Sequence, residues 1–392
     1  MKALVVAPQP FFSPRGTPFS VYYRTLVSSE LGAEIDFLTY GEGQDVDIPN
    51  VNIIRIPRFN FLGNVKIGPS PLKLFLDLFI IAKMISLLIK NKYDFVHAHE
   101  ESVFFARFMK PLFGFKLIYD MHSSLPQQLT NFNFSSSKFL YSIFKTLEDS
   151  CLKTVDAVIT ICPDLYNYVN TIIEDKNKHF LIENSIFEPV RLKHSTTQKT
   201  DDVNIENVSI LEHKDLVVYA GTLEKYQGID LLIKGFKYTV EQYPKAFLII
   251  VGGSTEQVKQ YSALAVEHKV SEQILFTGRV PQSLAKKYTG IAKVLVSPRS
   301  EGTNTPLKVY EQLASGIPLV ATNIYSHTQV LTPEVSFLVE PTPESIGKGI
   351  TSALLDKSES SRKVAAAKKM YEEQYSRTVY TQKLKKLFEV VK

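Results

Sequence analysis

Short runs of β-branched and apolar residues alternate with helical stretches along almost the whole chain. Helices that fall between successive strands are typical of parallel sheets with crossover connections. Twelve such runs are too many for one comfortable doubly wound sheet, so the pattern predicts an α/β fold with two sheets. The predicted strands are Ala3–Ala7, Ile35–Thr39, Asn52–Ile56, Phe95–Ala98, Lys116–Asp120, Ala157–Ile161, Leu216–Ala220, Phe247–Val251, Ile274–Thr277, Val294–Ser297, Leu319–Ala321 and Ser336–Val339.

The chain is long enough for two domains, and a polar segment separates its two halves. At 392 residues, each half can bury a core of its own. From Lys193 to Lys214, polar residues replace the apolar periodicity, which indicates a linker over 191–214. We therefore predict one domain over 1–190 and another over 215–376. The last helical segment, Val379–Val391, could pack on either domain.

Charge and cysteine content exclude several classes of protein. Lys and Arg number 45 against 40 acidic residues, and this excess is too small to indicate a nucleic acid partner. The two cysteines, Cys151 and Cys162, are too few for a disulfide framework, which favours a reducing, cytoplasmic location.

The segment Leu72–Ile89 is the one part of the sequence that is apolar enough to be considered as a membrane helix. Lys73, Asp77 and Lys83 interrupt it, and it has barely the length that a membrane span needs. An amphipathic core helix is the first interpretation, and a helix that lies on lipid is the alternative.

The stretch Arg299–Pro318 predicts an anion site followed by a ribose site. It runs from a strand end through a polar loop into a helix, with Thr305 as the expected N-cap and Pro306 as the first helical residue. The free amides at a helix start attract phosphate, and Lys308 adds a positive charge there. Glu311, one turn further on, can accept two hydroxyl hydrogen bonds from a ribose. Phosphate beside a diol indicates a nucleotide.

With these residues in view, the chain resembles the retaining, nucleotide-sugar-dependent glycosyltransferases of family four, which have the GT-B fold. Each motif alone is weak, but their order and spacing together are specific. The motifs are Pro10–Phe19, Asp94–His99, Tyr119–His122, Leu181–Ser185, Tyr219–Leu232, Leu248–Gly253, Phe276–Gly278 and Glu311–Pro318.

The resemblance implies two Rossmann-like domains facing a central cleft. In such enzymes the C-terminal domain binds a nucleotide sugar as co-substrate, with no other cofactor, and the N-terminal domain binds the acceptor. The last helix, 377–392, often returns to the N-terminal domain. The implied reaction moves a hexose-type unit from a UDP- or GDP-linked donor to a glycan or lipid-linked acceptor in cell-surface glycan synthesis.

The chain departs from the family pattern where the donor sugar is held. The family usually has an acidic residue eight positions before the ribose-binding glutamate, and that position here is Thr303. Glu301 lies ten positions before it. The sugar hydroxyls are therefore expected to meet either Glu301 or the pair Thr303 and Asn304.

A second departure concerns the leaving diphosphate. The family commonly has an Arg and a Lys in the glycine-bracketed loop, where this chain has Thr222 and Gln227. The neutralising charge must come from elsewhere, and Lys308 is the first candidate. The others are Lys225, Arg279 and Arg299. The departure leaves open an alternative, a nucleotide-sugar-binding protein without transferase activity.

His122 resembles the histidine that lines the cleft in the family and contacts the donor sugar. It follows a predicted strand, at the edge of a parallel sheet where ligands bind. Asp120 would face the same way and could orient the imidazole. Gly16, after the first strand, would let the backbone approach a phosphate, with Arg15 beside it.

A metal-dependent hydrolase is the remote alternative. His97 and His99 lie two apart on a predicted strand and share a face, so they could bind a metal together with His122. No further cluster at ligand spacing supports this, and Asp45–Asp47 reads as a solvated turn. We predict no metal site.

These arguments predict a retaining, metal-independent glycosyltransferase. Basic residues near Leu72–Ile89, which are Lys66, Lys73, Arg107 and Lys110, allow peripheral contact with an anionic membrane at the inner face of the cell. The predicted catalytic residues are His122, Glu301 and Lys308. The predicted donor-binding residues are Gly16, Gly221, Thr222, Arg279, Thr303, Asn304, Thr305, Leu307 and Glu311.

Overall fold

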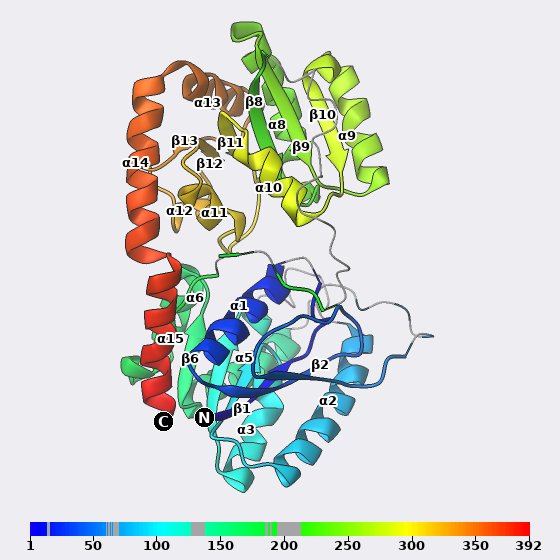
Figure 1. Cartoon of the computed structure of the whole chain (residues 1–392), viewed down its shortest axis with the longest axis vertical. Coiled ribbons are helices and arrows are strands. Elements are labelled where there is room, and N and C mark those ends of the chain that lie inside the picture. Colours follow the sequence, from blue (N-terminus) through cyan, green and yellow to red (C-terminus); the bar gives the residue numbers. More distant parts are fainter. Residues whose placement is uncertain are drawn as a thin grey trace. The chain divides into compact units, whose positions relative to one another are not determined.

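The chain forms two compact units in the computed structural model (Figure 1). Unit 1 comprises Met1–Thr196 and Arg377–Lys392, and unit 2 comprises Thr197–Ser376. The structure describes residues 1–13, 16–59, 61, 63, 65, 70–126, 138–184, 187–188, 190–193 and 213–392, with the backbone alone at 138–140. Most of the predicted linker over 191–214 lies outside these residues.

Unit 1 is built on a parallel sheet with the strand order β3-β2-β1-β4-β5-β6-β7. Its strands are β1 (Lys2–Ala7), β2 (Glu34–Thr39), β3 (Val51–Arg55), β4 (Phe95–His99), β5 (Lys116–Met121), β6 (Ala157–Thr160) and β7 (His179–Leu181). Its helices are α1 (Gly16–Glu30), α2 (Pro71–Lys90), α3 (Ser102–Phe113), α5 (Lys138–Thr154), α6 (Pro163–Asn170), η2 (Lys176–Lys178) and α15 (Arg377–Val391).

Unit 2 is built on a second parallel sheet, with the order β10-β9-β8-β11-β12-β13. Its strands are β8 (Asp215–Ala220), β9 (Ala246–Val251), β10 (Ile274–Gly278), β11 (Val294–Ser297), β12 (Leu319–Thr322) and β13 (Phe337–Val339). Its helices are η3 (Lys225–Gln227), α8 (Ile229–Gln242), α9 (Thr255–Glu267), η4 (Ser271–Gln273), α10 (Gln282–Gly290), α11 (Lys308–Ala314), α12 (Tyr325–Thr328), α13 (Pro343–Leu355) and α14 (Lys357–Gln374).

The two sheets confirm the predicted fold class, and the twelve predicted strands correspond to β1–β6 and β8–β13. β7 was not predicted, because a three-residue strand gives no measurable period. The central strands are buried on both faces, which explains why they read as continuous apolar runs in the sequence.

Both sheets reverse their strand order at the same relative place. β1 lies between β2 and β4, and β8 lies between β9 and β11. The chain therefore leaves neighbouring strands in opposite directions, and the carboxyl ends of β1 and β4, and of β8 and β11, frame a crevice where ligands bind in such sheets.

Helix α15 packs on unit 1, although it follows unit 2 in sequence. The ring of Phe388 lies 5.4 Å from that of Phe95 in β4. The Lys383 ammonium lies 2.6 Å from a Glu183 carboxylate oxygen. The core of unit 1 is thus completed by a helix that is separated in sequence from the rest of the unit.

Close helix packing in unit 2 depends on two glycines. A Cβ atom at Gly347 in α13 would lie 2.3 Å from the Gly235 carbonyl oxygen in α8. One at Gly235 would lie 2.5 Å from the Pro343 carbonyl oxygen. The two helix backbones approach each other too closely for any other residue.

Gly347→Ala is therefore expected to lower the free energy of unfolding of unit 2 by about 2 kcal/mol, because the added methyl group meets backbone atoms. Gly290→Ala is the matched control, since a Cβ atom at this helical glycine would have no heavy atom within 4 Å. Urea unfolding followed by circular dichroism measures both. Equal stability of the two variants would contradict the close packing.

No helix of the described residues is long and apolar enough to cross a membrane. α2 begins after Ser70, whose hydroxyl accepts a hydrogen bond from the Lys73 amide. One of its faces enters the core of unit 1, as the first interpretation of Leu72–Ile89 predicted. Its opposite face is apolar and exposed.

Candidate functional site

The loop after β8 is held in a tight turn at the switch point of unit 2. The Tyr219 hydroxyl donates a hydrogen bond to the Thr222 carbonyl, at 2.6 Å. Gly252 has φ +119, and a Cβ atom there would lie 2.0 Å from the Gly221 carbonyl oxygen. A Cβ atom at Gly228, which has φ +68, would lie equally close to the Pro298 carbonyl oxygen after β11. The loops that follow the two central strands are thus packed directly on each other.

Arg299 fixes the loop that follows β11. Its Nε donates to the Glu301 carbonyl at 2.6 Å, and its Nη1 donates to the Asn304 carbonyl at 3.1 Å. Its guanidinium lies 5.2 Å from the centre of the Tyr226 ring. One side chain therefore sets the path of the loop from 299 to 304 and joins it to η3.

Lys308 carries a buried ammonium group with no hydrogen-bond partner among the described residues. Its Nζ lies 4.0 Å from the centre of the Tyr219 ring and 3.6 Å from the position of a Cβ atom at Gly221. Burial and, to a smaller extent, the positive charge of Arg299 together lower the pKa of Lys308 to about 7. An ammonium group in this setting lacks the anion that would balance it.

Two side-chain oxygen atoms, one just before Lys308 in the sequence and one in the loop after β8, are also buried with no hydrogen-bond partner among the described residues. They are Thr305 Oγ1 and Gln227 Oε1. Polar atoms that folding leaves unpaired indicate either water or a ligand.

The predicted start of the helix after Thr305 is wrong. α11 begins at Lys308, and Leu307, in the helical region, precedes it without a side-chain cap. The Pro306 carbonyl instead accepts a hydrogen bond from the Val309 amide, which closes a separate turn. Thr305 therefore lies before this turn and does not cap the helix. The positive charge at this place comes from the Lys308 side chain rather than from a long helix dipole.

Glu311 lies three residues after Lys308 on α11, as the spacing predicted. Its carboxylate is half-buried and lies 3.9 Å from the Lys286 ammonium. Burial raises the pKa of Glu311, and Lys286 opposes the rise. Such a half-buried carboxylate can accept hydrogen bonds from hydroxyl groups.

The other predicted residues of unit 2 differ in their exposure. Glu301, Thr303 and Thr222 are exposed, and Asn304 is partly buried. A side-chain amide of Gln329 donates to the Thr303 carbonyl.

Arg279 does not lie at the switch point. It is exposed and follows the edge strand β10, two strands away from β8. Lys225, another candidate for the missing charge, is exposed in η3. Of the four candidate cations, Arg299 and Lys308 are close enough that the charge of one lowers the pKa of the other.

His327 supports this loop and was not predicted. Its Nε2 lies 2.9 Å from Ser297 Oγ, and its Nδ1 lies 2.9 Å from the Thr322 carbonyl oxygen. The Thr322 hydroxyl in turn donates to the Arg299 carbonyl. Burial lowers the pKa of His327 to about 4, so the ring is neutral. Because Ser297 lies thirty residues away in sequence, no local spacing indicated the pair.

In unit 1, a buried network surrounds Asp120. Its Oδ2 lies 3.0 Å from His97 Nε2, 3.3 Å from Arg24 Nε and 3.4 Å from His99 Nδ1. Its Oδ1 lies 3.4 Å from His122 Nε2, which also lies 3.1 Å from His99 Nδ1. Asp120 is thus placed to orient His122, whose side chain is buried against this network.

Charges inside this network determine its protonation. Burial alone would raise the pKa of Asp120, but Arg24 and the histidines hold it well below its usual range. Burial lowers the pKa of His122 to about 4 and that of His99 well below its usual range. The network therefore holds an ionised Asp120 carboxylate, the Arg24 guanidinium and the neutral imidazoles of His99 and His122.

The grouping of His97 and His99 is the one that a metal site would need. Their ligand atoms and one from Asp120 lie within 4.8 Å of one another. His122, the third ligand in the hydrolase alternative, is replaced in this group by Asp120. The Arg24 guanidinium already supplies positive charge to the same carboxylate oxygen, which disfavours a cation there.

Gly16 is the first residue of α1, and a Cβ atom there would have no heavy atom within 4 Å. The backbone at this end of β1 is therefore open to a neighbour. Arg15 lies outside the described residues.

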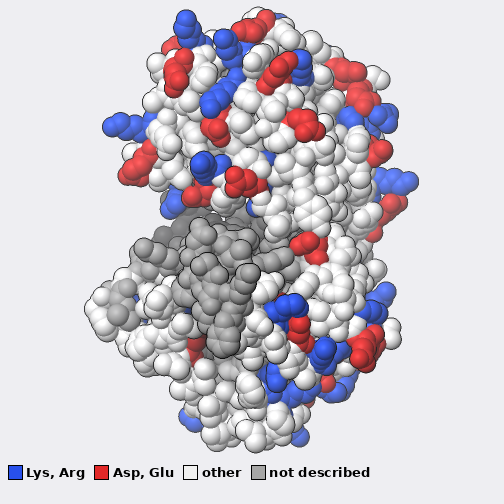
Figure 2. All heavy atoms as spheres, turned by 180° about the vertical axis from the view of Figure 1, so that it is seen from behind, with Lys and Arg blue, Asp and Glu red and all other residues white. Residues whose placement is uncertain are grey.

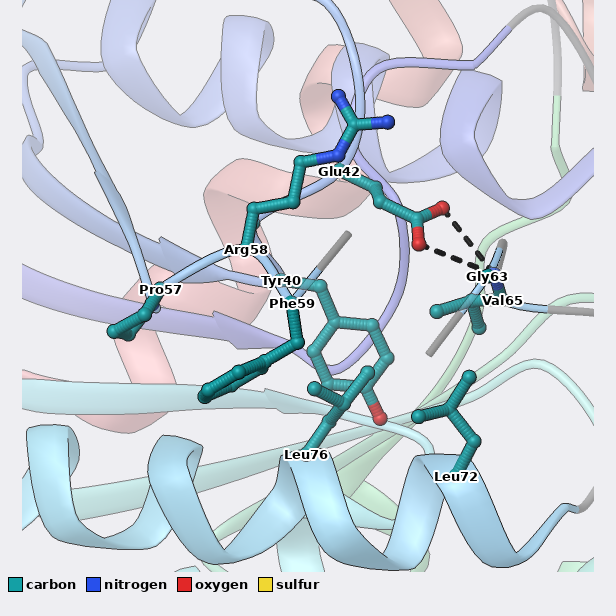
Figure 3. Close-up of a pocket in the computed structure, with 10 residues that line it drawn as sticks. Tyr40, Glu42, Pro57, Arg58, Phe59, Gly63, Val65, Leu72 and Leu76 are labelled. Atoms are coloured by element: carbon teal, nitrogen blue, oxygen red, sulfur yellow. Dashed lines mark hydrogen bonds between the residues drawn. The ribbon is translucent and has the colours of Figure 1, made fainter. Parts of the chain in front are cut away.

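A small cavity lies between the start of α2 and the ends of β2 and β3 (Figure 3). Tyr40, Leu72 and Leu76 point into it, and a Glu42 carboxylate oxygen accepts a hydrogen bond from the Val65 amide at 3.2 Å. The Tyr40 hydroxyl donates to Asp77 at 2.6 Å, which turns the acidic residue of α2 inward. This cavity holds about one water molecule and is too small for a sugar.

Two families match the chain, each over one unit. Residues 201–370 match the family described as Glycosyl transferases group 1, and residues 23–186 match Glycosyltransferase Family 4. A Bacillus subtilis protein that is named as a glycosyltransferase, YtcC, is 25% identical over 321 residues, which are 77% of this chain and 74% of that protein.

Two solved structures share the fold of the whole chain. Sucrose-phosphate synthase from Thermosynechococcus elongatus has a TM-score of 0.76 at 16% identity, and the match covers 99% of this chain and 98% of that one. Anabaena HepE, solved in complex with UDP and glucose, has a TM-score of 0.70 at 12% identity, with 99% of each chain covered.

Proposed function

This chain belongs to the glycosyl transferases group 1 and has the GT-B fold, and we propose that it transfers a sugar from a UDP- or GDP-linked donor with retention of configuration. The acceptor is a glycan or a lipid-linked saccharide in cell-surface glycan synthesis. The protein acts in the cytoplasm, at or near the inner face of the cell membrane. The reaction needs no metal and no cofactor besides the donor, and nucleic acid takes no part.

The unpaired ammonium of Lys308 carries this proposal. It lies at the switch point of unit 2, beside Gly221, where the loops after β8 and β11 pack together. A nucleoside diphosphate would supply the missing anion. HepE, with the same fold, was solved with UDP, which supports a nucleotide as the ligand.

Each neighbouring residue has a role in donor binding. Glu311 would accept hydrogen bonds from the ribose hydroxyls. The loop that Arg299 holds would contact the donor sugar, through Glu301 or through Thr303 and Asn304. Thr305 would donate its hydroxyl to the diphosphate.

Because the chain offers no obvious protein nucleophile for a double displacement, retention is attributed to attack of the acceptor on the face of the sugar from which the diphosphate departs. The acceptor oxygen forms the new bond to the anomeric carbon as the old bond to phosphate oxygen breaks. The departing diphosphate takes the proton of the acceptor hydroxyl, so no protein base is needed. Lys308 stabilises the charge that develops on the diphosphate. His122, held by Asp120, shapes the wall of unit 1.

A second candidate is a nucleotide-sugar-binding protein without transferase activity. The observation that favours it is the replacement of the usual basic pair by Thr222 and Gln227. Arg299 and Lys308 together can supply the same charge, so we prefer the enzyme.

The deciding experiment is thermal stabilisation by UDP, GDP, ADP and CMP, without added metal, on the wild type and Glu311→Ala. A shift with one diphosphate that the variant loses places the nucleotide at α11 and selects the donor to test for transfer. Binding without turnover of that donor would favour the second candidate. No shift with any nucleotide would contradict both.

The affinity for the nucleoside diphosphate is expected to fall as pH rises above about 7. Only protonated Lys308 attracts the diphosphate, and its pKa in the free protein is about 7. A bound diphosphate raises this pKa, so each pH unit above the free value costs up to about tenfold in affinity. Titration calorimetry measures the profile, and Lys308→Arg should flatten it. An unchanged slope in this variant would contradict the assignment.

A further inference from the structure

We propose that the outer face of α2, with the end of α3, docks on the surface of a bilayer that contains anionic lipid. The outer face is the set of large apolar side chains that these helices expose. Its members are Leu74, Phe75, Leu78, Ile85 and Ile89 on α2, and Phe108 and Leu112 on α3.

The exposed residues of α2 form a row along one side of the helix. Leu74, Leu78, Ile85 and Ile89 recur at helical spacing, and Leu78 is 62% exposed and Ile89 70%. The row is about 22 Å long, at 1.5 Å of rise per residue. Its far side enters the core, so the helix is apolar on two sides and only one of them is covered.

Aromatic side chains continue the apolar surface beyond the start of the row. Near the start of α2, the Phe75 ring lies 5.7 Å from that of Phe59, which lies 6.1 Å from that of Phe61. Phe61 is 82% exposed. Figure 2 shows the opposite face of the molecule, where the described part of unit 1 below the grey atoms is largely white.

The charges beside the outer face are positive. The acidic residue of α2, Asp77, is turned inward to the Tyr40 hydroxyl. Lys83, Lys90 and Lys92 are exposed and have no acidic partner among the described residues. Basic side chains around an apolar helix face are complementary to acidic lipid headgroups.

A groove marks the end of the outer face. It has a volume of about 240 Å³ and lies between the end of α2 and the end of α3. Ile89 and Phe113 give it apolar walls, and Lys90 and Lys92 line it as well. A phospholipid with an acyl chain against these walls would have its headgroup phosphate near the lysines that line the groove.

These charges favour a bilayer over a second copy of the chain. Two outer faces in contact would set the lysines of one α2 near those of the other, and like charges oppose such an association. An anionic bilayer instead has an apolar interior that can bury the row, and negatively charged headgroups that can pair with the lysines beside it.

The test is sedimentation of the full chain with vesicles of phosphatidylcholine alone and of an equal mixture with phosphatidylglycerol. We expect binding to the mixed vesicles. Leu78→Gln with Ile85→Gln should reduce the partition coefficient roughly tenfold or more, as should Lys83→Gln with Lys90→Gln. High salt should weaken the binding of the wild type.

Matched controls replace apolar residues of similar exposure in unit 2, with Val266→Gln and Leu355→Gln, and these should bind as the wild type does. Circular dichroism shows that each variant is folded, and the UDP-induced shift in melting temperature should be unchanged. Absence of binding to the mixed vesicles would overturn the proposal, as would equal loss in the controls. A wild type that dimerises without binding vesicles, and an apolar variant that is monomeric, would instead show a contact between copies.

Discussion

Lys308→Met is expected to slow sugar transfer by about a hundredfold or more, because it removes the fixed positive charge that meets the leaving diphosphate. The same change should raise the melting temperature of the protein without ligand. The Lys308 ammonium group is buried without a hydrogen-bond partner among the described residues, which costs free energy of folding. A methionine fills the space over the Tyr219 ring without burying a charge.

These opposite effects separate a functional lysine from a structural one. Steady-state kinetics should show the loss in kcat as well as in kcat/KM, since the charge acts on the departing group. Lys293→Met is the control, because this lysine is exposed and precedes β11 at the other end of the strand. A Lys308 variant that is less stable and nearly as active as the control would refute the role.

Arg24→Met is expected to destabilise unit 1 by about 3 to 5 kcal/mol, because it leaves the Asp120 carboxylate buried without its guanidinium partner. Arg24 and Asp120 are both fully buried, so water cannot replace the lost charge. Hydrogen exchange of β4 and β5 measures the effect within unit 1, since a chain of two units need not unfold in one step. Arg362→Met, which removes an exposed ion pair with Glu359, should leave stability nearly unchanged.

The same network predicts that unit 1 loses stability in acid. His99 and His122 have lowered pKa values and are neutral when folded, so the unfolded chain binds more protons below its histidine pKa of about 6.5. Stability should be fully present above that pH and fall towards pH 4. The pKa of Asp120 is also lowered, which adds a further loss at still lower pH. Stability that stays constant from neutral pH to about 4 would contradict this protonation state.

The alternation of apolar runs and helical stretches in the sequence was sufficient to predict both sheets, because strands buried on both faces are continuous apolar runs. It also placed His97 and His99 on one face of a strand. It could not show that Arg24, from a helix far earlier in the chain, meets Asp120 between them. Contacts of this kind depend on how α1 crosses the sheet, and no local pattern records that.

Local rules also gave an incorrect boundary for α11. Thr305 and Pro306 have the residue types of a helix start, but the loop that Arg299 holds reaches the helix two residues later. Tertiary contacts therefore overruled the capping preference. Lys308 and Glu311 still lie three residues apart on one helix, because that relation does not depend on where the helix begins.

The position of α15 has a consequence for how the protein folds during its synthesis. A ribosome releases the strands of unit 1 first, then all of unit 2, and only then the helix whose Phe388 packs on Phe95. Unit 2 can complete its fold during synthesis, whereas the earlier unit must wait with an uncovered surface. A nascent chain stalled before Arg377 should therefore protect unit 2 from protease and leave unit 1 sensitive. Residues made after unit 2 thus complete the domain whose synthesis began first.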